Sequence, residues 1–199
     1  MHDRPYDAAF RAMAVREFMD YGITYAFPFA LGDGPPHGHE GFAGSLAMFT
    51  KATIPKPSFA VFELLDRMRG NRAPCRSSNP PVGGLACLAP AGGPLWILLY
   101  NILEDYRHAP YTTQVEVRVQ NLPPGRWRAV RTDIAPGKCD PWKVWHALGE
   151  PEPLTAEQRR RLLEAAQLPP PEAIPVHGNV LRFRMPGFSA SLIELTPGH

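Results

Sequence analysis

The chain has 199 residues, of which 44% are hydrophobic and 20% are charged, and its formal net charge is +2. These values are typical of a globular protein with a sizeable core, and they exclude a disordered polypeptide. The 21 basic residues are scattered along the sequence. Because nucleic-acid-binding proteins gather such residues on one face, we expect no nucleic-acid partner.

The cysteines and the first residues of the chain indicate the cellular compartment. Cys75, Cys87 and Cys139 are an odd number without CxxC spacing, which favours reduced thiols over a zinc site or a disulfide framework. The polar start, Met1–Pro5, lacks an apolar signal core, and no stretch is long enough to span a bilayer. We therefore expect a cytoplasmic protein with no membrane partner.

The N-terminal third begins with a predicted helix over residues 6–21. Gly22 suits the position after a helix end, where positive φ is favoured. The almost continuous apolar run of residues 23–31 then predicts a strand covered on both faces, as in a parallel sheet. The expected buried stripe of the helix consists of Tyr6, Phe10, Met13, Ala14 and Phe18.

A loop rich in glycine and proline follows, over residues 32–44, and then a short apolar piece, residues 46–49. The spacing next predicts a helix over residues 58–69, which Gly70 ends. Helix, strand, loop and helix in this order are typical of about one repeat of an α/β barrel. The expected buried stripe of the second helix is Phe59, Phe62, Leu65 and Met68.

Beyond a linker-like stretch at residues 70–81, the pattern becomes that of a β protein. Residues 95–103 are strongly apolar, and valines alternate with polar residues over 115–120. Further strands are predicted at 126–133, 180–185 and 188–196. Several short strands separated by proline and glycine favour a β-sandwich.

One helix interrupts this sandwich. Thr155 and Gln158 have the spacing of a capping box, which predicts a helix start, with Leu162, Leu163 and Ala166 on its buried side. Trp127, Trp142 and Trp145 admit two interpretations, a sugar-stacking platform or packing. We favour packing, because Trp142 and Trp145 would share one side of a helix.

Four phrases in this order carry a family resemblance. The chain contains Ile-Pro-Lys-Pro at 54–57, Leu-Leu-Tyr-Asn at 98–101, Pro-Trp-Lys-Val-Trp at 141–145 and Leu-Gly-Glu-Pro at 148–151. Over nearly its full length it resembles the C-terminal part of glycoside hydrolase family 39, which contains β-xylosidases and α-L-iduronidases. The resemblance implies an α/β fragment, the last strand and helices of a (β/α)8 barrel, over residues 1–70. A linker at 71–83 and an all-β sandwich with one inserted helix at 84–199 complete the expected organisation.

The same resemblance implies that the catalytic residues lie outside this sequence. In the family the acid/base follows an asparagine at the end of barrel strand four, and the nucleophile ends strand seven. The sequence contains no Asn-Glu dipeptide, and by resemblance it corresponds to the part after strand seven. A complete barrel takes about 250 residues, so we assign no catalytic residue and expect no activity from the chain alone.

Candidate substrate-binding residues follow from the resemblance to strand eight, whose C-terminal end faces the sugar in a barrel. They are Phe29, where xylosidases place a tryptophan, together with Leu31, Asp33 and, in the following loop, His39. Ser45 stands about where an iduronidase would present an arginine, so the sugar, a xyloside or a uronide, stays open. His37, His39 and Glu40 are a weak metal signal, and we expect neither a metal nor a cofactor.

Three functions are compatible with the sequence. The first is the C-terminal portion of a family 39 hydrolase, which would act on carbohydrate only when the missing barrel is supplied, for example by a separate N-terminal barrel polypeptide. The second is a non-catalytic carbohydrate-binding or accessory module, and the third is a structural domain that binds a barrel-bearing partner. Because the predicted strand at 23–31 has no evident sheet partner, we expect the isolated chain to associate through it or to be poorly soluble.

Overall fold

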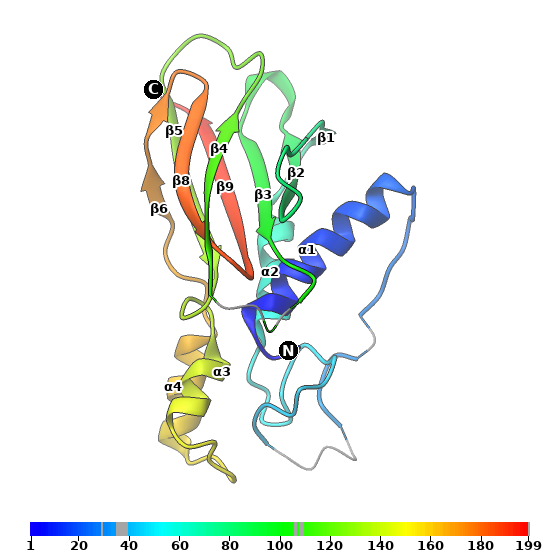
Figure 1. Cartoon of the computed structure of the whole chain (residues 1–199), viewed down its shortest axis with the longest axis vertical. Coiled ribbons are helices and arrows are strands. Elements are labelled where there is room, and N and C mark those ends of the chain that lie inside the picture. The colour runs from blue at the N-terminus through cyan, green and yellow to red at the C-terminus, as the bar shows by residue number, and fades with distance from the viewer. Residues whose placement is uncertain (29, 35–39, 106, 108–109, 199) are drawn as a thin grey trace.

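Four α-helices and two antiparallel sheets form the described part of the chain, a computed structural model that covers residues 1–28, 30–34, 40–105, 107 and 110–198 (Figure 1). None of the described helices is both long and apolar enough to cross a membrane. The helices are α1 (Pro5–Asp20), α2 (Pro57–Arg67), α3 (Pro141–Ala147) and α4 (Ala156–Ala165), and a 3-10 turn spans Pro90–Gly92.

The larger sheet has six strands in the order β1-β2-β3-β9-β5-β6, and the smaller has three in the order β4-β8-β7. The first strand, β1, lies inside the stretch interpreted as a linker. The strands of the larger sheet are β1 (Asn71–Ala73), β2 (Val82–Leu88), β3 (Leu95–Asn101), β5 (Trp127–Ile134), β6 (Glu172–Ile174) and β9 (Ser189–Pro197). Those of the smaller sheet are β4 (Thr112–Arg118), β7 (Val176–His177) and β8 (Val180–Pro186).

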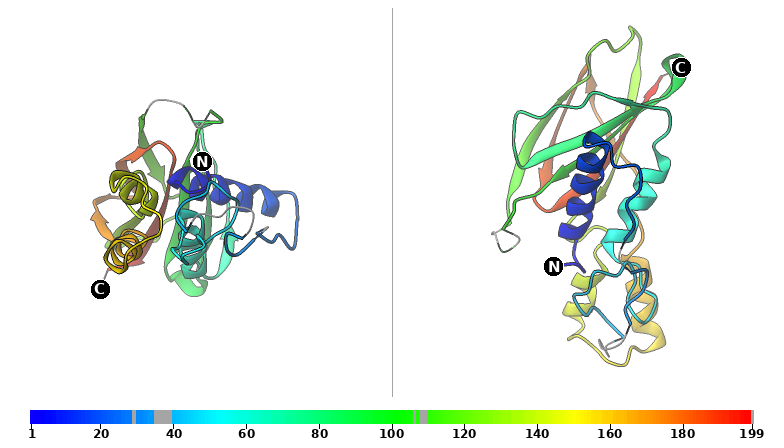
Figure 2. Two further views of the ribbon diagram at one scale, coloured as in Figure 1. Left: turned by 90° about the horizontal axis from the view of Figure 1, so that it is seen from below. Right: turned by 90° about the vertical axis from the view of Figure 1, so that its right-hand side faces the viewer.

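Strand β3 is apolar up to Tyr100 and Asn101 at its end because both of its faces are covered. Ile97 and Leu99 pack toward the smaller sheet, whereas Leu98 packs toward helices α1 and α2. Its partner β9 alternates in the same way, with Leu192 opposite Leu98 in the register. The domain therefore has three layers, namely two helices, the six-stranded sheet and the three-stranded sheet (Figure 2).

Strand β4 confirms the prediction from alternating valines. Val115 and Val117 pack in the core between the two sheets, whereas the residues between them are exposed. Glu116 on the exposed face pairs with Arg182 of β8 at 2.7 Å. The period of two in the sequence thus reflects one buried and one solvated face.

Helix α1 is confirmed in position, but its predicted buried stripe is only partly right, because Tyr6 and Met13 pack against the core whereas Phe10 and Phe18 do not. The face against the sheet and α2 is made of Ala8, Ala9 and Ala12, which are fully buried, while Phe10 and Phe18 are 44% and 37% exposed. Small side chains let the helix axis approach its neighbours closely. Periodicity located the helix correctly, but it could not show which face of the helix packs against the sheet and α2.

The buried side of helix α2 also differs from the predicted one. Ala60, Val61 and Leu64 form its fully buried side, whereas Phe59, Phe62 and Leu65 are only partly buried. Met68, also in the predicted stripe, is buried just beyond the helix end. The two helices therefore share one core with Leu98 and Leu192 of the sheet, which makes them part of the sheet's own packing.

The predicted strand at residues 23–31 is not formed. Helix α1 ends in a Schellman motif, in which Gly22 has φ +70° and the Ile23 amide donates to the Phe18 carbonyl at 2.8 Å. The described residues from 23 to 30 then belong to no helix or strand. A strand requires neighbouring strands, and the described residues provide none along this run.

Two helices, α3 and α4, stand where the sequence predicts one inserted helix. The capping box of Thr155 and Gln158 is present at the start of α4, as predicted. Asp140 caps α3 by accepting from the Lys143 amide at 3.3 Å. Burial raises the pKa of the Asp140 carboxyl, while the bonds from the Gly137 and Lys143 amides act in the opposite direction.

The tryptophans of α3 confirm the packing interpretation. Trp145 is buried, lies against Phe42 with ring centroids 5.6 Å apart and donates from its indole nitrogen to the Pro151 carbonyl. Trp142 lies between the guanidinium of Arg4 and the ring of His146. These contacts join α3 to segments of the first 70 residues.

Shortening Leu64 should destabilise the helices and the sheet together, because this side chain of α2 is fully buried in their common core. We expect Leu64→Ala to lower the free energy of unfolding by about 2–5 kcal/mol. Urea denaturation followed by circular dichroism measures this loss. Leu88→Ala removes a leucine that is 44% exposed and serves as the control with a small effect. Two separate transitions for helix and strand signals would contradict the shared core.

Candidate functional site

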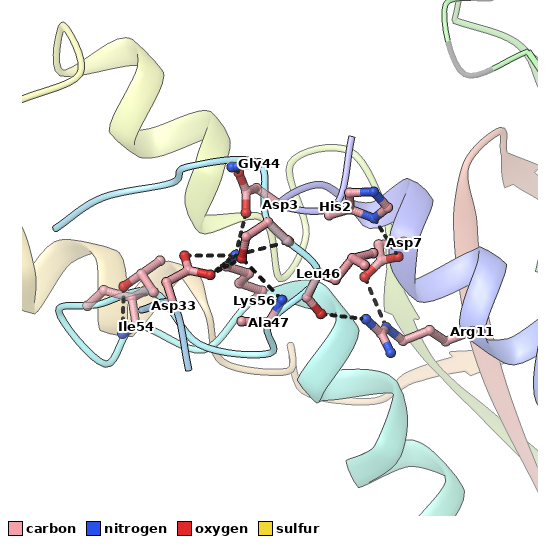
Figure 3. A network of polar contacts seen from close by, with 12 residues as sticks. His2, Asp3, Asp7, Arg11, Asp33, Gly44, Leu46, Ala47, Ile54 and Lys56 are labelled. Carbon is pink, nitrogen blue, oxygen red and sulfur yellow. Dashed lines mark hydrogen bonds and ion pairs between the residues drawn. The ribbon is translucent and has the colours of Figure 1, made fainter. Parts of the chain in front are cut away.

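A buried ammonium group lies where residues 31–33, at the end of the segment that follows α1, meet the start of α2 (Figure 3). Lys56 is the residue before α2, and its side chain is fully buried. Its Nζ lies 2.7 Å from Asp3 Oδ1 and 3.0 Å from Asp33 Oδ2. The cation thus joins the N-terminus, the end of residues 23–33 and the beginning of α2.

The charge of Lys56 explains why two carboxylates surround it. A lysine at a helix N-terminus is opposed by the helix dipole, and acidic side chains are favoured there. Moving an ammonium group out of water is costly unless opposite charges and hydrogen bonds compensate. Asp3 and Asp33 supply that compensation, and they leave the cluster with one negative charge in excess.

Hydrogen bonds fix both carboxylates. Asp3 Oδ2 accepts from the Gly44 amide at 2.6 Å, and Asp33 Oδ1 accepts from the Ser45 hydroxyl. The backbone of Asp33 also donates to the Phe49 carbonyl at 3.0 Å. Residues 44–49 are therefore held against residues 31–33 by side-chain and backbone bonds together.

A second ion pair ties α1 to the same loop. Asp7 is buried and accepts from Arg11 Nε at 3.0 Å, while Arg11 Nη2 donates to the Leu46 carbonyl at 3.0 Å. His2 Nδ1 lies 3.4 Å from the other oxygen of Asp7. Figure 3 shows this pair beside the Lys56 cluster, with the loop between them.

Two of the four candidate substrate-binding residues, Leu31 and Asp33, lie within the described part of the chain. Asp33 belongs to the Lys56 cluster, with a side chain that is 0% exposed. Leu31 is 69% exposed, and its carbonyl accepts from the amides of Met48 and Phe49. Phe29 and His39 lie outside the described residues. The structure thus brings Asp33 into a network and leaves Leu31 at the surface.

Glu40, from the weak metal signal, has a structural partner. Its Oε2 accepts from the Leu154 amide at 3.1 Å, and its carbonyl accepts from the Ala52 amide. His37 and His39 lie outside the described residues. The described contacts of Glu40 connect the loop to the segment before α4.

Lys56 and Asp3 were not singled out as site residues from the sequence. A lysine between two prolines, at a cap position where serine, threonine, asparagine or aspartate is usual, is the local signal that could have found the first. No local signal identifies Asp3, because its partner lies 53 positions away along the chain. The pairing depends on the tertiary fold.

Sequence comparison places this fold in a family. The family described as "Glycosyl hydrolases family 39" matches residues 1–180. The chain belongs to glycoside hydrolase family 39. A β-xylosidase from Caldicellulosiruptor saccharolyticus is 26% identical over 173 residues, which cover 84% of this chain and 34% of that protein.

Solved structures show the same fold at lower identity. A monomeric β-xylosidase from Caulobacter crescentus CB15 superposes with a TM-score of 0.78 at 23% identity, covering 100% of this chain and 42% of that one. A family 39 enzyme from Xanthomonas axonopodis pv. citri gives 0.73 at 16% identity, with 99% and 42% covered. A bacterial orthologue of human α-L-iduronidase gives 0.70 at 18% identity, with 99% and 39% covered. The family 39 chain thus spans only about a third to two fifths of the length of these relatives.

Replacing Lys56 by methionine should destabilise the protein strongly, because it leaves Asp3 and Asp33 buried without their cation. We expect a loss of about 3–5 kcal/mol at pH 7, measured by urea denaturation. Lys51→Met, at an exposed lysine of the same loop, should change stability by less than about 0.5 kcal/mol.

The stability loss caused by Lys56→Met should become smaller as the pH is lowered. Without the ammonium, two buried carboxylates face each other with no opposite charge, so neutralising them by protonation favours the folded variant. Relative to wild type, Lys56→Met should therefore recover stability as the pH falls from 7 toward about 4. A pH-independent deficit, or one as small as that of Lys51→Met, would contradict the role given to the cluster.

Proposed function

We propose that this chain is the C-terminal portion of a family 39 glycoside hydrolase, whose activity is the hydrolysis of O-glycosidic bonds when the rest of the catalytic barrel is supplied. The observation that carries the proposal is the match of the whole fold to 42% of the Caulobacter β-xylosidase, together with family membership over residues 1–180. Residues 1–70 are the end of the barrel, 71–83 the connection and 84–199 the accessory sandwich. The carbohydrate is a xyloside or an iduronide, the substrates named for its relatives.

The two carboxylates that the Lys56 cluster brings together do not have the form of a catalytic pair, which is compatible with this division. Retaining glycosidases use two carboxyl groups about 5–5.5 Å apart, one as nucleophile and one as acid/base. Asp3 and Asp33 are close to a common cation, but both are buried and ion-paired. A carboxylate held in this way offers neither a free nucleophile nor a proton donor.

Within this C-terminal portion, the end of the segment that follows α1 is the part that faces the sugar. In the proposed barrel, Phe29, Leu31, Asp33 and His39 lie at the substrate side of strand eight. Leu31 supplies exposed apolar surface, and Asp33, anchored by Lys56 and Ser45, fixes the chain beside it. Asp33 thereby acts as a positioning residue.

An autonomous carbohydrate-binding module is less well supported. Such a module would present aromatic rings to solvent as a stacking platform. Trp145 is buried against Phe42, and Trp142 lies between Arg4 and His146. The packing of these rings favours the portion-of-a-hydrolase interpretation.

If the two catalytic carboxylates belong to the rest of the barrel, as proposed, the isolated 199-residue chain should not hydrolyse nitrophenyl β-xyloside or nitrophenyl α-L-iduronide. Release of nitrophenol measures this, and the complete Caulobacter β-xylosidase serves as the positive control. Turnover that co-purifies with the folded chain would contradict the proposal. Retention on a xylan column without turnover would favour the binding-module alternative.

A further inference from the structure

A groove separates helix α2 from the C-terminal end of α4. It encloses about 240 Å³, which is less than the roughly 300–1,000 Å³ of pockets that hold drug-sized ligands, so it has room for a single small ring. Both walls come from this chain, and the groove therefore does not depend on any segment outside it. The side chains that matter are Phe59, Glu63 and Arg67 on one wall and Leu163, Gln167 and Leu168 on the other.

Hydrogen bonds and core contacts hold the two walls in place. Arg159, near the start of α4, donates from Nε to the Ala52 carbonyl at 3.2 Å, which ties α4 to the loop before α2. Beyond the other end of α4, the Ala166 carbonyl accepts from the Cys139 thiol at 3.0 Å. Leu168 packs against the core that α2 shares with the sheet. The groove is therefore formed before any ligand binds, which lowers the entropy loss on binding.

Three of the lining side chains are apolar. Phe59, Leu163 and Leu168 are all partly buried, so each still presents surface to the groove. The Phe59 ring is held against Phe49, with ring centroids 4.6 Å apart. Ligand pockets are lined predominantly by side chains of this kind, which cover the C–H groups of the ligand.

The other three lining side chains are polar, planar and exposed. Glu63 and Arg67 lie one turn apart on the same face of α2, and Gln167 lies on the opposite wall. Within the part of the chain that the structure describes, the Glu63 carboxylate and the Gln167 side-chain amide form no hydrogen bond or ion pair. Arg67 has one ion pair there, with Glu194 at 3.8 Å. The groove thus offers a carboxylate that accepts, a guanidinium that donates and an amide that does both.

We propose that this groove is a second carbohydrate-binding site, which holds one neutral pyranose ring. It shares no residue with the candidate substrate-binding set of Phe29, Leu31, Asp33 and His39. A pyranose ring combines apolar C–H surface with hydroxyl groups that both donate and accept, so it matches the apolar side chains and the mixed polar set at once. The inference goes beyond the proposed function, because a ring bound here is held and not cleaved.

The charges in the groove disfavour other kinds of ligand. Glu63 and Arg67 carry opposite charges, so the groove has no net charge with which to attract a phosphate or a carboxylate. An apolar side chain of a protein partner would fit the apolar lining. It would, however, leave Glu63 and Gln167 out of water without hydrogen-bond partners, which is unfavourable by about 1–3 kcal/mol for each group. A neutral ring that carries several hydroxyls avoids both problems.

Proton–nitrogen correlation NMR of the full 199-residue chain tests this site, with methyl β-D-xylopyranoside as the probe. We expect the amides of residues 59–67 and 163–168 to shift as the sugar is added, with a dissociation constant on the order of 1 mM. Glu63→Ala removes a charged acceptor from the groove and should weaken binding about tenfold. Asp66→Ala removes a carboxylate of the same helix that is 82% exposed and lies outside the groove lining. It is the matched control and should bind within about twofold of wild type.

Four results would overturn the inference. They are no shift at up to about 50 mM sugar, shifts confined to residues 31–33 and 40–49, equal weakening by Glu63→Ala and Asp66→Ala, and equal shifts with glycerol in place of the sugar. None of them bears on hydrolysis, so the nitrophenol assay of the proposed function stays independent. Millimolar affinity for one ring is also too weak to retain a protein on a xylan column, so this site does not produce the result assigned to a binding module.

Discussion

Backbone amides and carbonyls that are buried away from water need hydrogen-bond partners, and large apolar side chains stabilise a fold when they are covered. Within the described part of this protein, the backbone of residues 24–28 forms no hydrogen bond, and the large side chains of this segment are mostly exposed. Tyr25 and Phe27 are mostly exposed, and the backbone around them makes no internal bonds. The interpretation of the molecule depends on this contrast, because the rest of the chain is well packed.

The packed part explains how the segment between α1 and α2 keeps its position. The alanine face of α1 and the buried side of α2 cover one face of the six-stranded sheet, while the three-stranded sheet covers the other. Lys56 pairs with Asp3 near the N-terminus and with Asp33, and it thereby fixes the end of the segment that follows α1. The segment between α1 and residue 31 is thus held at both ends.

Much of the fold could be predicted from the sequence, since local patterns have local causes. Alternating valines identified β4, and the capping box identified the start of α4. The buried faces of α1 and α2 were predicted only in part, because periodicity locates an apolar stripe without saying which surface is available to cover it. The strand at 23–31 was predicted from apolarity, but a strand forms only with neighbours, and the described residues provide none along this segment.

The candidate site was predictable only in part. Asp33 came from the family resemblance, and its burial against Lys56 required knowledge of how distant segments meet. Lys56 carried a local signal in its unusual cap position, whereas Asp3 and Ser45 carried none. Pairings over tens of residues depend on the sheet and helix packing that brings the segments together.

Hydrogen–deuterium exchange of the isolated chain in dilute solution tests the central claim most directly. We expect the amides of residues 24–27 to exchange at rates close to those of an unfolded peptide, while the amides of β3 and β9 in the sheet interior are strongly protected. Protection of residues 24–27 comparable to that of β3 would show that this run already has its partners, and would contradict the account.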